Sequence, residues 1–170
     1  MTSKPQASTP AATPRSAARL AAVQALYSWE LGGAGADALI EDFLNHGLGR
    51  KAFVPASDDS ESEIETVLAS PNAPLLTAIL RGVISQRDSL DAMVEGSLST
   101  DWPAERLEAV LRAILRAGAF ELSAMPNTPV RVVISEYVDI AHAFYAGPEP
   151  KLVNAVLDRI ARVIRTEELG

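Results

Sequence analysis

Apolar residues recur at spacings of three and four through the second half of the chain, between Leu107 and Ile164. Proline and glycine divide this stretch into three segments. Such spacing places each apolar set on one face of a helix, so it predicts three helices that bury stripes against each other. The three stripes are Leu107, Val110, Leu111, Ile114, Leu115, Gly118 and Leu122; Val130, Val133, Ile134, Tyr137, Val138 and Ala141; and Leu152, Val153, Val156, Leu157, Ile160 and Ile164.

The N-terminal half predicts further helices. The first runs from Pro14 or Arg15 to Leu31, with proline in its first turn and Gly32-Gly33 at its end. On one face it carries Leu20, Val23, Tyr27 and Leu31. A second helix, capped by Asp37, extends through Leu44 with Ile40, Phe43 and Leu44 as its stripe, and a third spans about 74–98.

Proline also sets the predicted ends of the C-terminal helices. Asp101-Trp102-Pro103 opens the fourth helix, which ends near Met125-Pro126. Thr128 caps the fifth, which Gly147-Pro148 closes, and the last runs from Glu149 to Glu167. Two stretches lack this pattern. We expect residues 1–14 to form a disordered tail and residues 46–74 to form a long acidic loop.

Composition supports a helical protein. The 170 residues suit one domain or two small subdomains, and apolar residues make up 48% with only 5% aromatic. There is no cysteine, which excludes disulfides and thiolate metal sites. With no secretory signal and no apolar run long enough to cross a bilayer, we expect a soluble, cytoplasmic protein without membrane contact.

The charge is unevenly distributed. Five acids, at positions 58, 59, 61, 63 and 65, lie in the predicted loop, and removing them from the formal net charge of −7 leaves −2. The first 29 residues contain Lys4, Arg15 and Arg19 and no acid. The N-terminal end is therefore the basic end, where nucleic acid would be attracted.

The sequence offers no catalytic constellation. It has no Ser-His-Asp grouping and no glycine loop in the right context, and its two histidines, His46 and His142, lack ligand spacing. We therefore expect a binding protein without catalytic activity, bound metal or cofactor.

Four segments in order resemble the NusB family of bacterial transcription antitermination factors. They are AVQALYSWEL (Ala22 to Leu31), DWPAERLEAVLRAILRAGAFEL (Asp101 to Leu122), TPVRVVISEYVDIAHAF (Thr128 to Phe144) and KLVNAVLDRI (Lys151 to Ile160). A related domain begins some ribosomal RNA cytosine methyltransferases, which gives an alternative relationship for the chain.

The resemblance implies an all-α bundle of about seven helices in two subdomains. Three helices would lie in residues 15–100 and the rest in 101–170. It also implies that the protein pairs with ribosomal protein NusE, that the pair binds the single-stranded boxA element of ribosomal RNA operons, and that it acts on the transcription elongation complex. Some relatives form homodimers, so a homodimer is a further expectation.

The resemblance also implies a set of site residues. The Arg-rich N-terminus of the family corresponds to Arg15 and Arg19, and Lys4, in the same basic segment, is a further expected RNA-binding residue. Four residues apart, Arg15 and Arg19 share one helical face and would meet successive phosphates. The loop before the last helix supplies the other RNA-binding residues, which are Phe144, Lys151 and Asn154. Tyr27 corresponds to a tyrosine near the partner surface, although its apolar stripe alone predicts a core position.

Other arginines have two interpretations. Arg112 and Arg116 would bind phosphate or, as we favour, pair internally with Glu121, Glu136 or Asp139. The set Arg159, Arg162 and Arg165 is more typical of a helix C-terminus than of an RNA groove. A competing hypothesis for the whole protein is a protein-only interaction module with little RNA affinity.

Overall fold

The computed structural model describes residues 13–45 and 71–169, and these segments contain helices and no strand. The predicted all-α class is confirmed. The helices are α1 (Pro14–Gly32), α2 (Ala36–Asn45), α3 (Ala73–Ser85), α4 (Arg87–Ser97), a 3₁₀ turn η2 (Ala104–Arg106), α5 (Ala109–Ala124), α6 (Val130–Phe144), α7 (Glu149–Ile164) and α8 (Thr166–Leu169). The predicted tail at 1–14 and loop at 46–74 lie almost entirely outside the described residues.

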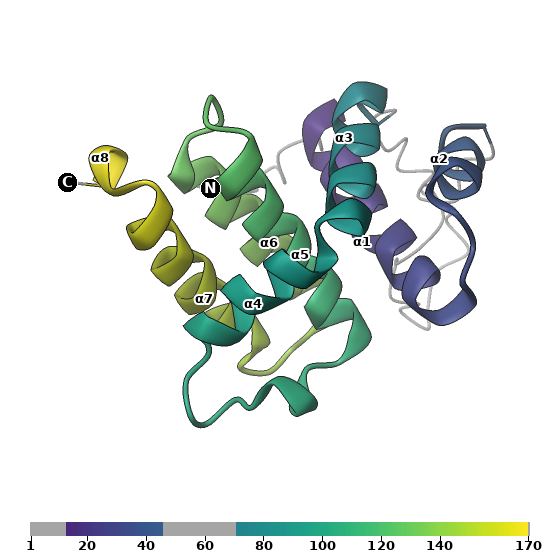
Figure 1. Cartoon of the computed structure of the whole chain (residues 1–170). Coiled ribbons are helices and arrows are strands. Elements are labelled where there is room, and N and C mark those ends of the chain that lie inside the picture. Colours follow the sequence, from purple (N-terminus) through teal and green to yellow (C-terminus); the bar gives the residue numbers. More distant parts are fainter. Residues whose placement is uncertain (1–12, 46–70, 170) are drawn as a thin grey trace, which may run out of the picture.

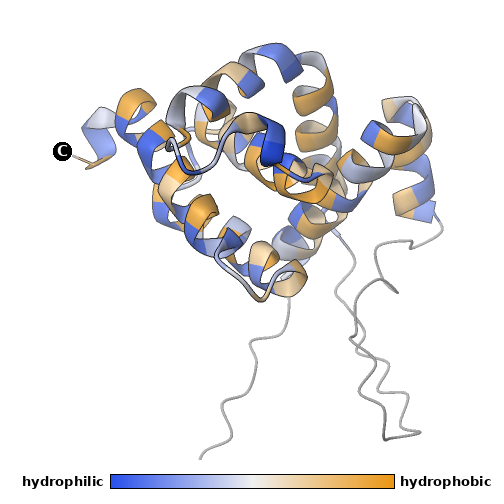
Figure 2. Cartoon of the chain, turned by 90° about the horizontal axis from the view of Figure 1, so that it is seen from below, coloured by the Kyte–Doolittle hydropathy of each residue, from blue (hydrophilic) through white to orange (hydrophobic). Residues whose placement is uncertain are grey.

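Helix α5 lies at the centre of the bundle, and it packs against α1, α3, α4, α6 and α7 (Figure 1). Nearly every side chain from Ala113 to Leu122 is buried. Apolar positions on the surrounding helices turn toward this centre, whereas polar positions face outward (Figure 2). Because α5 is covered on all sides, its charged residues Arg116 and Glu121 are buried too.

Two glycines allow α5 to pack closely against α3 and α7. A Cβ built at Gly82 of α3 would overlap the Phe120 ring of α5. A Cβ at Gly118 of α5 would lie 2.8 Å from the side chain of Leu157 in α7. Glycine at these two places therefore sets how near the helices pack.

Local signals explain the ends of α1. Thr13 accepts a hydrogen bond from the Ser16 N–H at 3.1 Å, and Pro14 takes the first helical position. Gly33 ends the helix with φ 67°, a left-handed conformation that favours glycine. The predicted bounds of this helix are confirmed, but its predicted stripe is only partly right: the Leu31 side chain is 64% exposed, and small residues such as Ala18 and Ala22 form the buried side.

Several predicted helix ends are wrong. The helix expected over 74–98 is two helices, because the chain leaves helical geometry at Gln86 and α4 turns onto α5 and α7. Asp37 lies within the first turn of α2 and does not precede it. Residues 101–103 precede a 3₁₀ turn, and α5 begins only at Ala109, because Leu107 and Glu108 are extended.

The last two helices also differ from expectation at their ends. Pro129, not Thr128, precedes α6, and the Val130 N–H is satisfied from far along the chain by a Glu168 carboxylate oxygen at 2.8 Å. Helix α7 ends at Ile164, and Arg165 separates it from the short α8. No helix in the described ranges is both long and apolar enough to span a membrane.

Candidate nucleic-acid interface

Arg19, predicted to face RNA, lies in the core. Its guanidinium is 2% exposed and donates two hydrogen bonds to Glu121 of α5, from Nε at 2.8 Å and from Nη2 at 3.0 Å. The Tyr137 hydroxyl of α6 donates to the same carboxylate at 2.5 Å. The cation is neutralised and hydrogen-bonded inside the protein, so Arg19 does not belong to a solvent-facing pair with Arg15.

A second carboxylate extends this cluster toward the surface. The Ser16 hydroxyl donates to Glu136 of α6 at 2.8 Å, and Arg19 Nη1 lies 3.6 Å from the same carboxylate oxygen. The start of α1 is thereby fixed to α5 and α6 together. In this way Arg19 holds in place the helix that carries Arg15.

The cluster has a defined protonation state. Burial raises the pKa of Tyr137 well above its ordinary value, and the neighbouring Glu121 carboxylate raises it further. Burial acts to lower the pKa of Arg19, but hydrogen bonding and attraction to Glu121 outweigh it and raise that pKa. The phenol therefore stays neutral and the guanidinium charged at neutral pH.

Arg15 is the exposed arginine of this end. It lies in the first turn of α1, and among the described residues it has no ion-pair partner. Lys4 falls outside the described residues.

The other predicted RNA residues gather around the turn between α6 and α7. Phe144 ends α6 and is half-buried against the core. Lys151 and Asn154 follow in the first turns of α7, three residues apart and both exposed. Asn154 also lines a groove of about 390 Å³ between α6 and α7, beside Ser135 and Val138.

The structure does not bring the two groups together. The start of α1 lies in the upper part of Figure 1, whereas the turn between α6 and α7 lies in the lower part. Tyr27 lies elsewhere again, toward the end of α1, where its ring is 38% exposed. The apolar stripe of α1 predicts a core position for Tyr27, and that prediction is wrong.

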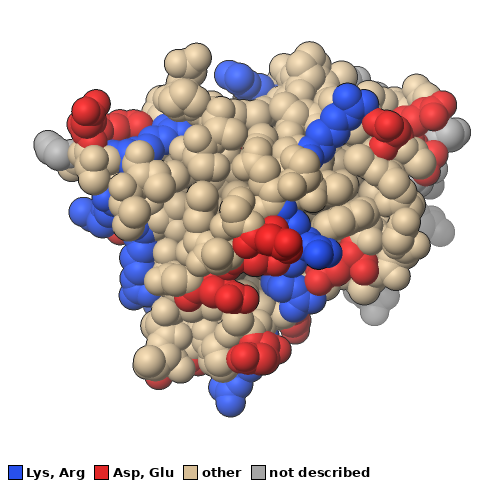
Figure 3. All heavy atoms as spheres, viewed as in Figure 1, with Lys and Arg blue, Asp and Glu red and all other residues tan. Residues whose placement is uncertain are grey.

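Most other arginines form internal contacts. Arg112 donates to Glu30 at 2.6 Å and to the Leu107 carbonyl, and Arg116 donates to Asp91 at 2.7 Å. Internal pairing was the favoured prediction and is confirmed, but the predicted partners were wrong, because the pairs link α5 to α1 and α4. Acidic and basic side chains are accordingly intermixed on the face shown in Figure 3.

Arg165 has a role that the sequence did not indicate. Its guanidinium donates to the backbone oxygens of Leu122 at 2.8 Å, Met125 at 2.8 Å and Thr128 at 2.5 Å, and so satisfies carbonyls at the end of α5 and in the turn that follows it. Glu168, three residues on, has a pKa lowered by its hydrogen bond from the Val130 N–H and by Arg165. Nearby, Arg162 pairs with Asp158 at 2.8 Å as a surface charge pair.

The described residues contain no group of three His, Asp or Glu side chains arranged to hold a metal ion. The candidate interface contains two separate exposed cations, Arg15 and Lys151. It also contains the half-buried ring of Phe144 and the exposed amide of Asn154. These groups suit contact with phosphates and bases.

Comparison with known proteins identifies the family. The model of the NusB family matches residues 16–162, which is most of the chain. The chain belongs to the NusB family.

Curated members of the NusB family align along most of their length. The transcription antitermination protein NusB of Rhodospirillum rubrum is 48% identical over 161 residues, covering 91% of this chain and 86% of the relative. That of Brucella ovis is 45% identical over 159 residues, covering 94% and 86%.

Solved structures of NusB proteins share the fold. NusB of T. maritima superposes with a TM-score of 0.70 at 24% identity, covering 93% of this chain and 98% of that one. A crystal structure of antitermination factors NusB and NusE in complex with dsRNA gives a TM-score of 0.66 at 22% identity, covering 88% and 97%. The helical arrangement is thus the NusB fold.

Proposed function

We propose that the protein is a transcription antitermination factor. It would bind the single-stranded boxA RNA of ribosomal RNA operons together with ribosomal protein NusE, and act on the transcription elongation complex in the cytoplasm. Membership of the NusB family supports this function, as do the names of the curated relatives. The solved complex of a NusB with NusE and dsRNA supports both kinds of partner.

The observation that carries the RNA part is the exposure of two unpaired cations in helix first turns. Arg15 lies in the first turn of α1 and Lys151 in the first turn of α7, and neither has an ion-pair partner among the described residues. The helix dipole is positive at these ends, so it adds to the charge of each cation at a position where a phosphate could bind. Asn154 and Phe144, beside Lys151, would contact a base. Because the two cations are well apart, one RNA strand would run between them across α6.

Tyr27 belongs to the proposed partner surface. It is exposed on a different part of α1 from Arg15. NusE would dock there and supply additional surface for the RNA, since two cations alone give only weak binding.

The test is binding of labelled boxA RNA to the protein, with and without NusE, across a salt series. Arg15→Ala and Lys151→Ala should each weaken binding and reduce the salt slope by about 0.7, the value for one phosphate contact on a single strand. Arg81→Ala is the matched control, because Arg81 is an exposed arginine already paired with Asp37 at 2.6 Å. It should leave the slope unchanged.

Equal effects of all three substitutions would mean that general charge, and not this face, attracts RNA. A scrambled RNA bound as tightly as boxA would reject the proposed sequence preference.

The second candidate function is a protein-only interaction module. The burial of Arg19 favours it, because the N-terminal RNA face has one cation fewer than expected on a chain of net charge −7. This function predicts binding to NusE with no gain in RNA affinity for the pair.

A further inference from the structure

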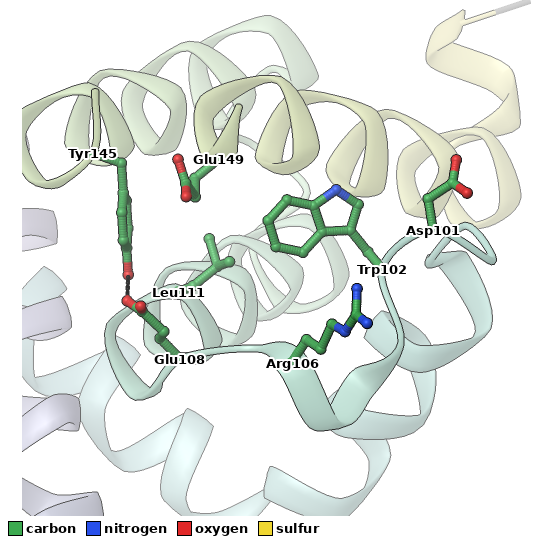
Figure 4. A pocket seen from close by; sticks show the side chains of 7 residues that line it. All are labelled: Asp101, Trp102, Arg106, Glu108, Leu111, Tyr145 and Glu149. Carbon is green, nitrogen blue, oxygen red and sulfur yellow. Dashed lines mark hydrogen bonds between the residues drawn. The ribbon is translucent and has the colours of Figure 1, made fainter. Parts of the chain in front are cut away.

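A recess of about 420 Å³ lies between η2, the start of α5 and the turn that leads into α7 (Figure 4). Two aromatic residues, Trp102 and Tyr145, form its walls, and Leu111 forms its floor. The lining also contains the charged residues Glu108, Glu149 and Arg106.

The aromatic walls are held in place. Trp102 and Tyr145 lie on two sides of the recess, with Leu111 between and below them (Figure 4). Both rings are half-buried and pack against the core. The Tyr145 hydroxyl donates to Glu108 Oε2 at 3.1 Å, and burial together with this bond raises the pKa of Tyr145, which keeps the hydroxyl a donor. The recess is therefore preformed.

One carboxylate oxygen at the polar end of the recess has no donor among the described residues. The Glu149 carboxylate points between Trp102 and Tyr145 (Figure 4). Its Oε2 atom is buried and has no hydrogen-bond partner among the described residues. This oxygen is packed beside Gly147. A buried carboxylate oxygen without a donor is unfavourable, and rotation of the Glu149 side chain would bring it to a donor in the recess.

The charged residues that line the recess indicate the charge of a ligand that would bind there. Glu108, Glu149 and Asp101 line the recess against a single cation, Arg106, so its formal charge is negative. Arg106 lies on the Trp102 side, away from the carboxylates of Glu108 and Glu149 (Figure 4). A phosphate or an acidic peptide would be repelled from the Tyr145 end, whereas a cation would be attracted.

We propose that this recess binds the side chain of an arginine presented by a protein partner. The guanidinium would lie between the rings of Trp102 and Tyr145 and donate to Glu149 and Glu108. A guanidinium suits both parts of the recess, because it stacks on aromatic faces and directs several N–H groups at carboxylates in a fixed plane. Lysine suits it less well, since its ammonium is a strongly hydrated point charge.

An RNA base stacked on Trp102 is the competing occupant. The carboxylates disfavour it, because the attached phosphate would lie close to them. The arginine site is independent of the proposed RNA face and would remain if RNA binding failed.

The test uses the full chain, labelled with ¹⁵N, and Nα-acetyl-arginine amide as the probe. The indole N–H signal of Trp102 should shift in a saturable way, with a Kd on the order of millimolar, as expected for one side chain. The indole of Trp29, which lies against Arg87 at 5.8 Å, should stay still and serves as the internal reference. The lysine analogue should bind several-fold more weakly.

Two variants separate the recess from general charge. Glu149→Gln should weaken arginine binding roughly tenfold, because it removes the charge from the acceptor. Glu105→Gln is the matched control: it makes the same charge change on η2, at an exposed residue outside the recess, and should change the Kd less than about twofold. Trp102→Leu removes the indole reporter, so its binding is followed by the backbone amide signals of the recess, which should no longer shift with arginine. The remaining amide spectrum reports whether each variant is folded.

Four results would overturn the proposal. They are no shift of Trp102, equal binding of arginine and lysine analogues, equal effects of Glu149→Gln and Glu105→Gln, and a single-stranded RNA oligomer that shifts Trp102 in competition with arginine. The last would assign the recess to a nucleobase.

Discussion

Arg19 and Glu121 form a two-pronged ion pair in the core, 102 residues apart in the sequence, with N–O distances of 2.8 and 3.0 Å. Glu121 is fully buried and Arg19 nearly so. The pair joins α1 to the central helix α5, and Tyr137 adds α6. An arginine in a basic N-terminal segment is thus a structural residue.

Arg19→Met should lower the free energy of unfolding by about 3–5 kcal/mol, because it leaves the Glu121 carboxylate buried without its cation. Urea denaturation measures the change. Adding Glu121→Leu should recover part of the loss, since the double variant has no unpaired charge. Arg81→Met is the control, and its exposed pair should contribute less than about 1 kcal/mol. A stable Arg19→Met would show that the pair does not anchor α1.

Tyr137 should make the protein sensitive to alkali. Its pKa is raised in the folded state, so above the ordinary value of 10.0 the unfolded chain loses this proton while the folded chain keeps it. Stability should therefore be fully present below pH 10 and decline above it, until the folded-state pKa is reached. Urea denaturation across this range measures the decline.

Tyr137→Phe should reduce this alkaline decline but lower stability at neutral pH by about 1–2 kcal/mol through the lost hydrogen bond. Tyr145, whose pKa is also raised, adds to the decline and is removed separately as Tyr145→Phe. An unchanged decline in both variants would place its origin elsewhere.

Arg165 should not be replaceable by lysine. Its planar guanidinium reaches several carbonyls at the end of α5 and in the turn that follows, which one ammonium cannot satisfy together. Arg165→Lys should cost about 1–3 kcal/mol. Arg162→Lys, at an exposed i,i+4 pair on the same helix, should stay within about 0.5 kcal/mol. Equal losses in the two variants would contradict the capping role.

Replacing Gly82 by alanine should lower the free energy of unfolding, whereas replacing Gly96 by alanine should raise it. Alanine at position 82 meets the Phe120 ring and should cost about 1–3 kcal/mol. Alanine at position 96, also helical, meets nothing within 4 Å and should stabilise by about 0.5–1 kcal/mol. Thermal unfolding of the two variants compares them directly, and stabilisation by both would mean that α3 and α5 are not tightly packed.

Local patterns predicted the helices more reliably than their ends. The three stripes after Leu107 correspond to α5, α6 and α7, because a face that must be buried repeats along the chain. The break at Gln86 carries no proline or glycine, so nothing local predicted it. The cap of α6 comes from Glu168, 38 residues away, and no local pattern could supply it.

The candidate site was predictable only in part. Arg15, Lys151 and Asn154 are exposed as a surface site requires, whereas Arg19 is not. Four residues apart on one helix, Arg15 and Arg19 looked equivalent by sequence. They differ because α5 and α6 cover Arg19 but not Arg15.

The sequence by itself determined the all-helical class, the extent of α1 and the apolar faces of the C-terminal helices, since periodicity, proline and glycine act locally along the chain. Only the tertiary structure decided which charges lie inside, which acids meet which arginines, and how Trp102, Tyr145 and Glu149 come together. Those outcomes depend on contacts between residues distant in the chain, and burial turns the same side chain from a surface cation into a structural one.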